Sequence, residues 1–277
     1  MKNFTLHCKG KLLHADKPLV MGILNLTTDS FYDGGKYFQE KAVLQRVEQM
    51  LQQGADIIDI GGMSTRPNAE IIDEGEELDR VIEPIRKIRA HFPEAILSID
   101  TFRSRVADEA IRHGVSIVND ISGGTEDEAI FAVAAKYGCP YILMHRKGNM
   151  ETMHKDTFYD DLLADMLDYF TRQITKAADA GIQDVIIDVG FGFSKTIQQN
   201  YSILKHLSVF QQLDKPILAG LSRKSMLYKL LNTTPDHALN ATSIVNTIAL
   251  QNGAGILRVH DVKEAAECVK IYKQVTD

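Results

Sequence analysis

The sequence predicts a (β/α)₈ barrel, a closed ring of eight parallel strands with helices around it. Short apolar runs alternate with amphipathic stretches along most of the chain, which is the order that a parallel sheet requires. The runs are nearly continuous, as expected for strands buried on both faces. The 277 residues suit one barrel, which takes roughly 250 residues. We therefore expect a single domain over residues 1–277.

Eight apolar runs are the predicted strands. They cover residues 19–25, 55–60, 95–100, 115–119, 140–145, 184–188, 216–221 and 255–260. Several follow a glycine that we expect to end the preceding helix in a left-handed conformation. These glycines are Gly54, Gly114, Gly138, Gly181 and Gly253. Strand–helix units repeated eight times favour closure into a barrel over an open sheet, with right-handed connections.

The stretches between the runs have apolar residues at helical spacing and charges on the opposite face. The clearest ones cover residues 40–53, 76–92, 104–113 and 160–180. Pro84 is expected to kink or split the second, because proline lacks an N–H and its ring clashes with the preceding turn. Residues 1–16 alternate like a hairpin, which we expect to cap the bottom of the barrel.

Composition argues against several classes of protein. The net charge of −6 argues against non-specific binding to nucleic acid or an anionic membrane. The three cysteines have no CxxC spacing, so neither a disulfide framework nor a zinc site is indicated. No apolar run reaches the roughly 18–20 residues needed to span a bilayer. We expect a soluble, cytoplasmic protein.

Polar residues end nearly every predicted strand. In barrels of this kind the substrate lies at the C-terminal ends of the strands. These ends carry Asn25, Asp59, Asp100, Asn119, Met144, His145, Asp188, Ser222, Arg223, Lys224, Arg258 and His260. A single aspartate there can simply cap a turn or a helix. A purely structural barrel has no need for so many polar strand ends, so the whole set predicts a site for a polar ligand.

Three loops at the same ends add chemistry. Residues 61–67 and 220–225 combine glycines, hydroxyls and cations, which together can bind an anion. Residues 25–37 contain two aspartates, aromatic residues and a Gly-Gly pair, and we expect them to form a mobile lid. Each loop is a weak signal alone, because many similar loops are only tight turns.

Other chemistries lack their motifs. The nine histidines show no HxH or HExxH spacing, which argues against a catalytic zinc held by several histidines. There is no GxSxG motif, so an α/β-hydrolase is not supported. Residues 190–195, GFGFSK, lack the spacing of a nucleotide-binding P-loop.

Eight segments closely resemble the dihydropteroate synthase family, in the family's order and spacing. They are MGILNLTTDSFYDGGKY, DIIDIGGMSTRP, LSIDTFRS, IVNDISGG, ILMH, IIDVGFGFSK, GLSRKS and LRVHDV. The resemblance implies a barrel, usually homodimeric, that acts in folate biosynthesis. The implied reaction joins 6-hydroxymethyl-7,8-dihydropterin diphosphate to p-aminobenzoate with the help of Mg²⁺. It also implies a target of sulfonamides, which compete with p-aminobenzoate.

The resemblance implies a role for most strand-end residues in binding the pterin. Asp100, Asn119 and Asp188 resemble the pterin binders, which suits a ring edge that carries several N–H donors. Lys224 resembles the lysine that reaches the pterin carbonyl. The residues that resemble those packed against the ring are Met144 and Phe193.

The resemblance also implies a diphosphate end and two mobile loops. Asn25 resembles the contact to Mg²⁺ and diphosphate, and an amide oxygen suits that hard ion. Arg258 and His260 resemble the residues that hold the diphosphate, and Ser222 lies near the p-aminobenzoate end. The loop candidates are Asp29 and Phe31 in the first loop, and Thr65, Arg66 and Pro67 in the second.

A mechanism follows as a hypothesis, with Asp29, Asp100, Asp188 and Lys224 as candidate catalytic residues. Departure of diphosphate leaves positive charge on the pterin methylene, and buried carboxylates stabilise it. The arylamine then attacks, and no strong general base is needed. We expect Asp59, unlike the other strand-end residues, to support the loop at 61–67.

Some positions depart from the family pattern, and other functions stay open. The family usually has proline at Thr28 and Val189, and a glutamate and a glycine near Met63 and Asn68. One alternative is a pterin-binding methyltransferase barrel. Another is a paralogue that binds pterin without catalysis. A third is a Schiff-base aldolase that uses Lys224, with the neighbouring Arg223 lowering the pKa of that lysine.

Overall fold

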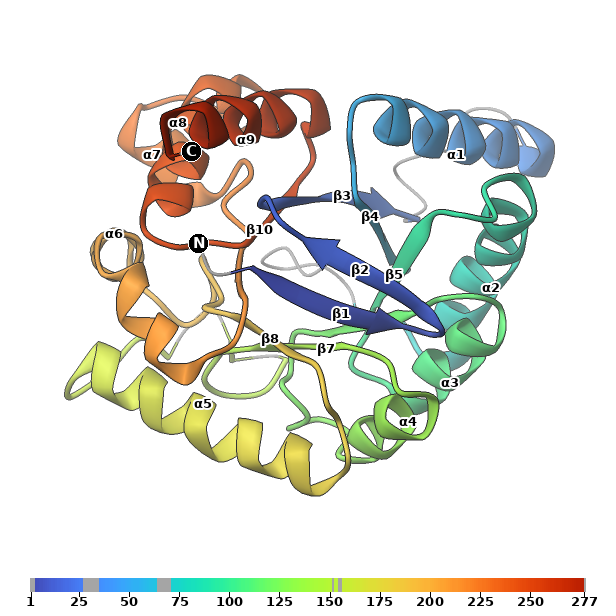
Figure 1. Ribbon diagram of the computed structural model, residues 1–277, viewed down its shortest axis with the longest axis horizontal. Helices are drawn as coiled ribbons and strands as arrows, with labels where there is room; N and C mark the ends of the chain where they lie inside the picture. Colours follow the sequence, from blue (N-terminus) through green and yellow to red (C-terminus); the bar gives the residue numbers. More distant parts are fainter. Residues whose placement is uncertain (1–2, 27–34, 64–70, 151, 154–155, 277) are drawn as a thin grey trace.

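The computed structural model describes residues 3–26, 35–63, 71–150, 152–153 and 156–276. The strands form a closed parallel barrel in the order β10-β3-β4-β5-β6-β7-β8-β9, and a separate antiparallel hairpin precedes it. Figure 1 looks along the barrel from the hairpin side, with the helices in a ring around the strands. The predicted (β/α)₈ barrel and N-terminal hairpin are confirmed.

Every predicted strand is present, and no boundary differs from its predicted position by more than two residues. The barrel strands are β3 (Leu19–Asn25), β4 (Ile57–Gly61), β5 (Ile96–Asp100), β6 (Ile117–Asp120), β7 (Tyr141–Met144), β8 (Val185–Asp188), β9 (Ile217–Ala219) and β10 (Ile256–Val259). The hairpin consists of β1 (Phe4–Cys8) and β2 (Lys11–Ala15).

The α-helices of the described residues lie between the strands and after the last one. They are α1 (Gly35–Gln52), α2 (Glu74–His91), α3 (Ser104–Arg112), α4 (Ala129–Tyr137), α5 (Leu162–Asp179), α6 (Ile197–Lys205), α7 (Ser225–Leu230), α8 (Leu239–Gln251) and α9 (Val262–Thr276). Pro84 lies inside α2, which runs unbroken, so the helix is not split. The five predicted helix-ending glycines all have positive φ. None of these helices is long and apolar enough to cross a lipid bilayer.

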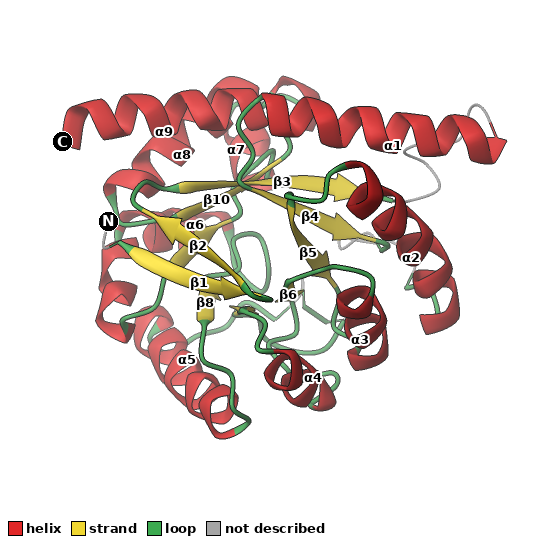
Figure 2. Cartoon of the chain, turned by 45° about the vertical axis from the view of Figure 1, so that its right-hand side comes forward, coloured by secondary structure: helices red, strands yellow, loops and turns green. Residues whose placement is uncertain are grey.

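Side chains alternate along each strand between the helices and the barrel interior. The lower interior layer is apolar and consists of Leu19, Met21, Ile57, Ile117, Ile142, Ile186, Leu218 and Ile256. Leu6, Cys8 and Ala15 of the hairpin pack onto this layer. Figure 2 shows β1 and β2 lying across the end of the barrel. The hairpin therefore closes the bottom of the barrel, as expected.

The upper interior layer is largely polar. Because the side-chain period of a strand is two, the residue two positions after the last apolar-layer member of a strand also faces the interior, one layer higher. These upper positions include Asp59, Asn119, Met144, Asp188, Gly220 and Arg258. The interior thus changes from apolar to polar toward the carboxyl ends of the strands, where barrel enzymes bind their substrates.

Replacing Leu6 by Ala should destabilise the barrel, because Leu6 is only 2% exposed and seals the apolar layer. We expect the free energy of unfolding to fall by about 2–4 kcal/mol, measured by urea denaturation. Leu12→Ala on the same hairpin is the control, since Leu12 is 55% exposed. Equal losses in the two variants would contradict the sealing role of the hairpin.

Candidate active site

A small pocket opens above the polar layer, at the carboxyl ends of the strands. Its lining residues are Asn119, Ile121, Met144, Asp188, Gly190, Phe191, Phe193, Gly220, Lys224 and Arg258. Six of these were predicted from the sequence: Asn119, Met144, Asp188, Phe193, Lys224 and Arg258. The cavity volume is about 30 Å³.

A buried ion network lies at the base of this pocket. The guanidinium of Arg258 donates from Nε to Asp59 Oδ2 at 2.7 Å and from Nη2 to Asp100 Oδ2 at 2.5 Å. Asp59 Oδ2 also accepts a hydrogen bond from Asn119 Nδ2 at 3.0 Å. The cation therefore lies between two carboxylates, and the amide is anchored to one of them.

The role expected for Asp59 is wrong within the described residues. It was expected to support the loop at 61–67, but its carboxylate bonds to Arg258 and Asn119 inside the barrel. The physical reason is strand parity, because Asp59 follows Ile57 by two residues and therefore faces the interior. Asp59 is fully buried and belongs to the site that the sequence assigned to its neighbours.

Burial sets the protonation of the carboxylates. Burial raises the pKa of Asp100 to about 7, and the Arg258 guanidinium opposes this shift. Burial likewise raises the pKa of Asp188, while the backbone N–H of Gly190 and the Lys224 ammonium oppose it. For Arg258, burial acts to lower the pKa, but Asp59 and Asp100 raise it above its usual range. The guanidinium thus stays charged while Asp100 titrates near neutral pH.

Lys224 stands over the aromatic wall of the pocket. Its Nζ lies 4.5 Å from the centroid of the Phe193 ring. Burial lowers the pKa of Lys224 to about 8, with Asp188 opposing and Arg258 adding to the shift. Arg223 instead pairs with Asp261, at 3.0 Å and 2.8 Å. The suggestion that Arg223 lowers the pKa of Lys224 is therefore wrong, since burial and Arg258 do so.

The structure brings together two further predicted pairs near the pocket. Ser222 Oγ lies 3.0 Å from His260 Nδ1 and accepts from the His260 backbone N–H at 3.2 Å. A Cβ built on Gly61 would lie 3.6 Å from Asn25 Oδ1 and 3.6 Å from the Cβ of Asp100. Asn25 and Asp100 therefore flank the same glycine. Four predicted site residues among those the structure describes do not line the small pocket itself: Asn25, Asp100, Ser222 and His260.

Several predicted positions lie outside the described residues. The site candidates among them are Asp29, Phe31, Thr65, Arg66 and Pro67, and the departures from the family pattern are Thr28 and Asn68. The two other departures are described, and both Met63 and Val189 are buried.

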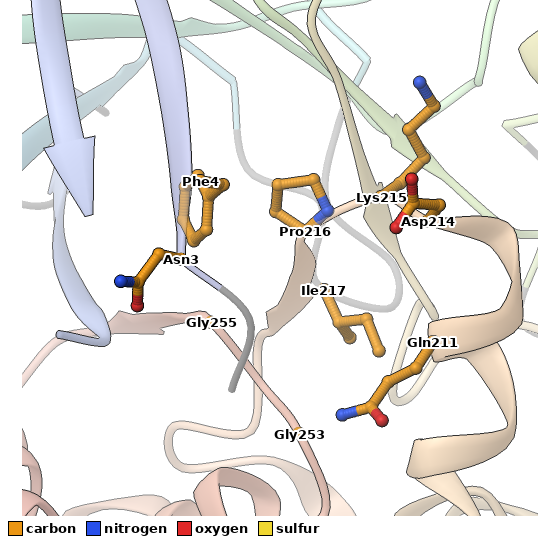
Figure 3. Close-up of a pocket in the computed structure, with 9 residues that line it drawn as sticks. All are labelled: Asn3, Phe4, Gln211, Asp214, Lys215, Pro216, Ile217, Gly253 and Gly255. Carbon is orange, nitrogen blue, oxygen red and sulfur yellow. The ribbon is translucent and has the colours of Figure 1, made fainter. Parts of the chain in front are cut away.

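A larger hollow of about 200 Å³ lies at the opposite end of the barrel. Figure 3 shows it between the start of β1 and the segments that lead into β9 and β10. Its lining residues are Asn3, Phe4, Gln211, Asp214, Lys215, Pro216, Ile217, Gly253 and Gly255. Its two charged residues are adjacent in the chain and of opposite sign, so it lacks the convergent buried groups typical of catalytic sites. The smaller pocket is the better candidate.

Replacing Asp59 by Asn should destabilise the protein strongly, because it removes a buried charge that compensates Arg258. We expect the free energy of unfolding to fall by about 3 kcal/mol or more in urea denaturation. Asp168→Asn is the matched control, because Asp168 is 65% exposed and pairs with Arg172 on the surface. A loss in the Asp59 variant no larger than in the control would mean that the network contributes little.

Comparison with known proteins identifies the relatives of this chain. Residues 21–260 match the model of the family described as pterin binding enzymes. The chain is 40% identical to the dihydropteroate synthase of Haemophilus influenzae over 270 residues, which is 97% of this chain and 98% of the relative. It is 42% identical to the dihydropteroate synthase of Escherichia coli K12 over 268 residues, covering 96% of this chain and 94% of that one.

Solved structures agree with these relatives. The dihydropteroate synthase of Yersinia pestis, solved with a sulfonamide drug, superposes with a TM-score of 0.91 at 40% identity and covers 98% of this chain and 99% of that chain. The enzyme of Xanthomonas albilineans in complex with 7,8-dihydropteroate gives a TM-score of 0.88 at 33% identity, with 98% of both chains covered. Both its sequence and its barrel therefore place the chain in the pterin-binding enzyme family, among the dihydropteroate synthases.

Proposed function

We propose that this transferase joins 6-hydroxymethyl-7,8-dihydropterin diphosphate to p-aminobenzoate, with the pocket above the polar layer holding the pterin ring. The observation that carries the proposal is that Asn119 and Asp188 line the pocket beside the apolar pair Met144 and Phe193, with Asp100 bonded to the lining residue Arg258. Carboxylate and amide oxygens suit the N–H donors on the ring edge. The apolar pair suits the faces of a flat ring.

Asp59 prepares the amide of Asn119 for this task. Its carboxylate accepts from Asn119 Nδ2 at 3.0 Å, which leaves the amide oxygen as the group that accepts from the ring. The orientation of the amide follows from this hydrogen bond. Asp59 thus acts beneath the pocket, without touching the ligand.

We infer that Arg258 moves when the ring enters, because its guanidinium occupies the Asp100 oxygen that the ring N–H donors would bind. The ring N–H donors replace the guanidinium at Asp100, so the carboxylate exchanges one donor for another. The released Arg258 then faces the diphosphate together with His260. This movement reconciles the position of Arg258 against Asp100 with its proposed role at the diphosphate end.

The reaction is a displacement at the methylene carbon of the pterin. The carbon–oxygen bond to diphosphate breaks, and its electron pair leaves with the diphosphate. The carboxylates of Asp100 and Asp188 stabilise the positive charge that develops on the ring and methylene, and Lys224 reaches the ring carbonyl. The arylamine nitrogen attacks the carbon and then loses a proton. The products are 7,8-dihydropteroate and diphosphate.

Asn25 is the residue that would contact Mg²⁺. The described residues contain no group of three or more His, Cys, Asp or Glu side chains that could hold a metal. One amide oxygen beside Asp100 is nevertheless compatible with Mg²⁺, which keeps several waters and binds mainly to substrate phosphates. When bound, the ion would neutralise charge on the diphosphate. Asn25 would orient that end of the substrate.

The p-aminobenzoate end is proposed to lie near Ser222, where the loops after β9 and β10 meet. Thr65, Arg66 and Pro67 would complete it from the second loop. Asp29 and Phe31 would close over the substrates from the first. Competition by a sulfonamide is expected at this end, since the Yersinia pestis relative was solved with such a drug.

The chain is proposed to act as one domain in a cytoplasmic homodimer. Helices α8 and α9 pack against each other and together carry exposed apolar side chains, which support the dimer. These side chains are Ile244, Ile248, Ile271 and Val275. The cysteines are free and buried, which is typical of a reducing compartment.

The direct test mixes the purified protein with the pterin diphosphate, p-aminobenzoate and Mg²⁺, and measures both products. We expect turnover by the wild-type chain and a loss of about 100-fold or more in kcat/KM for Asp100→Asn, because one charge-stabilising group is removed. Asp168→Asn, a surface change, should keep full activity.

Each other outcome favours a named alternative. Binding of 7,8-dihydropteroate without turnover would favour the non-catalytic paralogue. Methyl transfer from a methylated pterin in place of condensation would favour the methyltransferase barrel. Borohydride trapping of Lys224 with a carbonyl substrate would favour the aldolase. Unchanged kinetics in Asp100→Asn would remove Asp100 from the site.

Affinity for 7,8-dihydropteroate should depend on pH in both directions. The pKa of Asp100 is raised to about 7, so its carboxylate is lost as pH falls below 7. The pKa of Lys224 is lowered to about 8, so its ammonium is lost as pH rises above 8. Calorimetric titration should therefore give the highest affinity between these values.

Two variants show which residue causes each limb of the pH profile of affinity. Asp100→Asn should remove the acid limb and Lys224→Met the alkaline limb, each with lower affinity overall. A profile that is flat from about pH 5.5 to about pH 9 would contradict both assignments.

A further inference from the structure

The loop after β8 has a backbone that is costly to hold. Gly190, Gly192 and Ser194 have φ values of 67°, 83° and 51°, so alternate residues are left-handed. Glycine accepts this conformation, but a serine does so only when its surroundings enforce it. Phe193, the aromatic wall of the pocket, lies between the last two of these residues. Its position therefore depends on whatever holds the loop.

Lys195 holds this loop from inside. Its side chain is buried, and its Nζ donates to the backbone oxygens of Gly190 and Phe193, both at 3.0 Å. The same Nζ lies 3.1 Å from His145 Nδ1 and 3.3 Å from the His145 backbone oxygen. An ammonium has three protons, so these four acceptors occupy it fully. One cation thus ties both ends of the loop to the end of β7.

Ser194 makes a second connection, to the loop that follows β7. Its backbone N–H donates to the oxygen of Met153 at 2.6 Å, and its Oγ accepts from the N–H of Lys147 at 2.9 Å. Met153 in turn packs with Met144 and Phe193 in one apolar cluster. The two loops that carry the walls of the pocket are therefore joined as one unit, with Lys195 at its centre.

A buried lysine is a costly way to fix a loop. Burial lowers the pKa of Lys195 to about 7, and Asp188 opposes this shift while Lys224 adds to it. Burying a charge is unfavourable unless it is paired and hydrogen-bonded. An apolar side chain would fill the same space, but it could not bond the carbonyls of Gly190 and Phe193. The hydrogen bonds are therefore what distinguishes lysine at this position.

We propose that Lys195 is a positioning residue for the pterin site, which fixes the Phe193 ring and, through it, the Lys224 ammonium that lies 4.5 Å above that ring. Lys195 does not line the pocket, so its side chain holds the loop without touching a ligand there. The part of this inference that concerns ligand affinity rests on the proposed function. The part that concerns the loop does not.

The test compares Lys195→Met with Lys176→Met as the control, because Lys176 is 57% exposed and pairs with Glu128 on the surface. Hydrogen exchange followed by mass spectrometry should show faster exchange at residues 145–153 and 189–194 in Lys195→Met only. Calorimetry should show affinity for 7,8-dihydropteroate about tenfold lower in Lys195→Met and nearly unchanged in Lys176→Met.

A double-mutant cycle separates positioning from a general loss of structure. If Lys195 acts through Phe193, then Lys195→Met should change affinity less than about twofold in a Phe193→Ala background. An additive loss, or unchanged exchange in Lys195→Met, overturns the proposal. If wild-type protein fails to bind the ligand, the proposed function is wrong, and the exchange data alone decide whether Lys195 holds the loop.

Discussion

The ion network of Asp59, Arg258 and Asp100 is the constraint on which the site depends. Two carboxylates and one guanidinium lie inside a barrel whose lower layer is apolar and sealed by a hairpin. Charges in such a place are expensive to bury and are tolerated only when each has its partners. Removing a partner is costly, so the network fixes the side chains that border the pocket. Asn119 is held by the same carboxylate.

This arrangement gives the pocket groups that are already oriented. In the proposed complex, the ligand would replace the guanidinium donor at Asp100 and would not have to strip water from a free carboxylate. Preorganised groups of this kind stabilise developing charge without reorganising during the reaction. A second unit, built by the loops after β7 and β8, fixes the apolar walls. The polar floor of the pocket and its apolar walls are therefore held by separate sets of interactions.

The sequence was sufficient to predict the fold, the strand ends and most of the pocket, because short buried strands and their terminal polar residues leave a local pattern. It was not sufficient to assign partners. Asp59 was predicted to support a loop, whereas Asp100 and Asn119 were predicted to bind the pterin, although all three face the barrel interior. Hydrogen bonds between strands cannot be read from the sequence of one strand. Lys195 stood in one segment of the family resemblance and in a failed phosphate-loop motif, but it was assigned no role. Its role depends on two carbonyls of its own loop and on His145, which follows β7 and lies 50 residues away in the chain.

The most direct measurement is a crystal structure of the chain with bound 7,8-dihydropteroate. The account predicts the pterin edge within hydrogen-bonding distance of Asp100, Asn119 and Asp188, with the guanidinium of Arg258 moved away from Asp100. The bond from Asp59 to Asn119 should persist. A ligand bound elsewhere, such as in the hollow beside the hairpin, or bound with the contact between Arg258 and Asp100 intact, would contradict it.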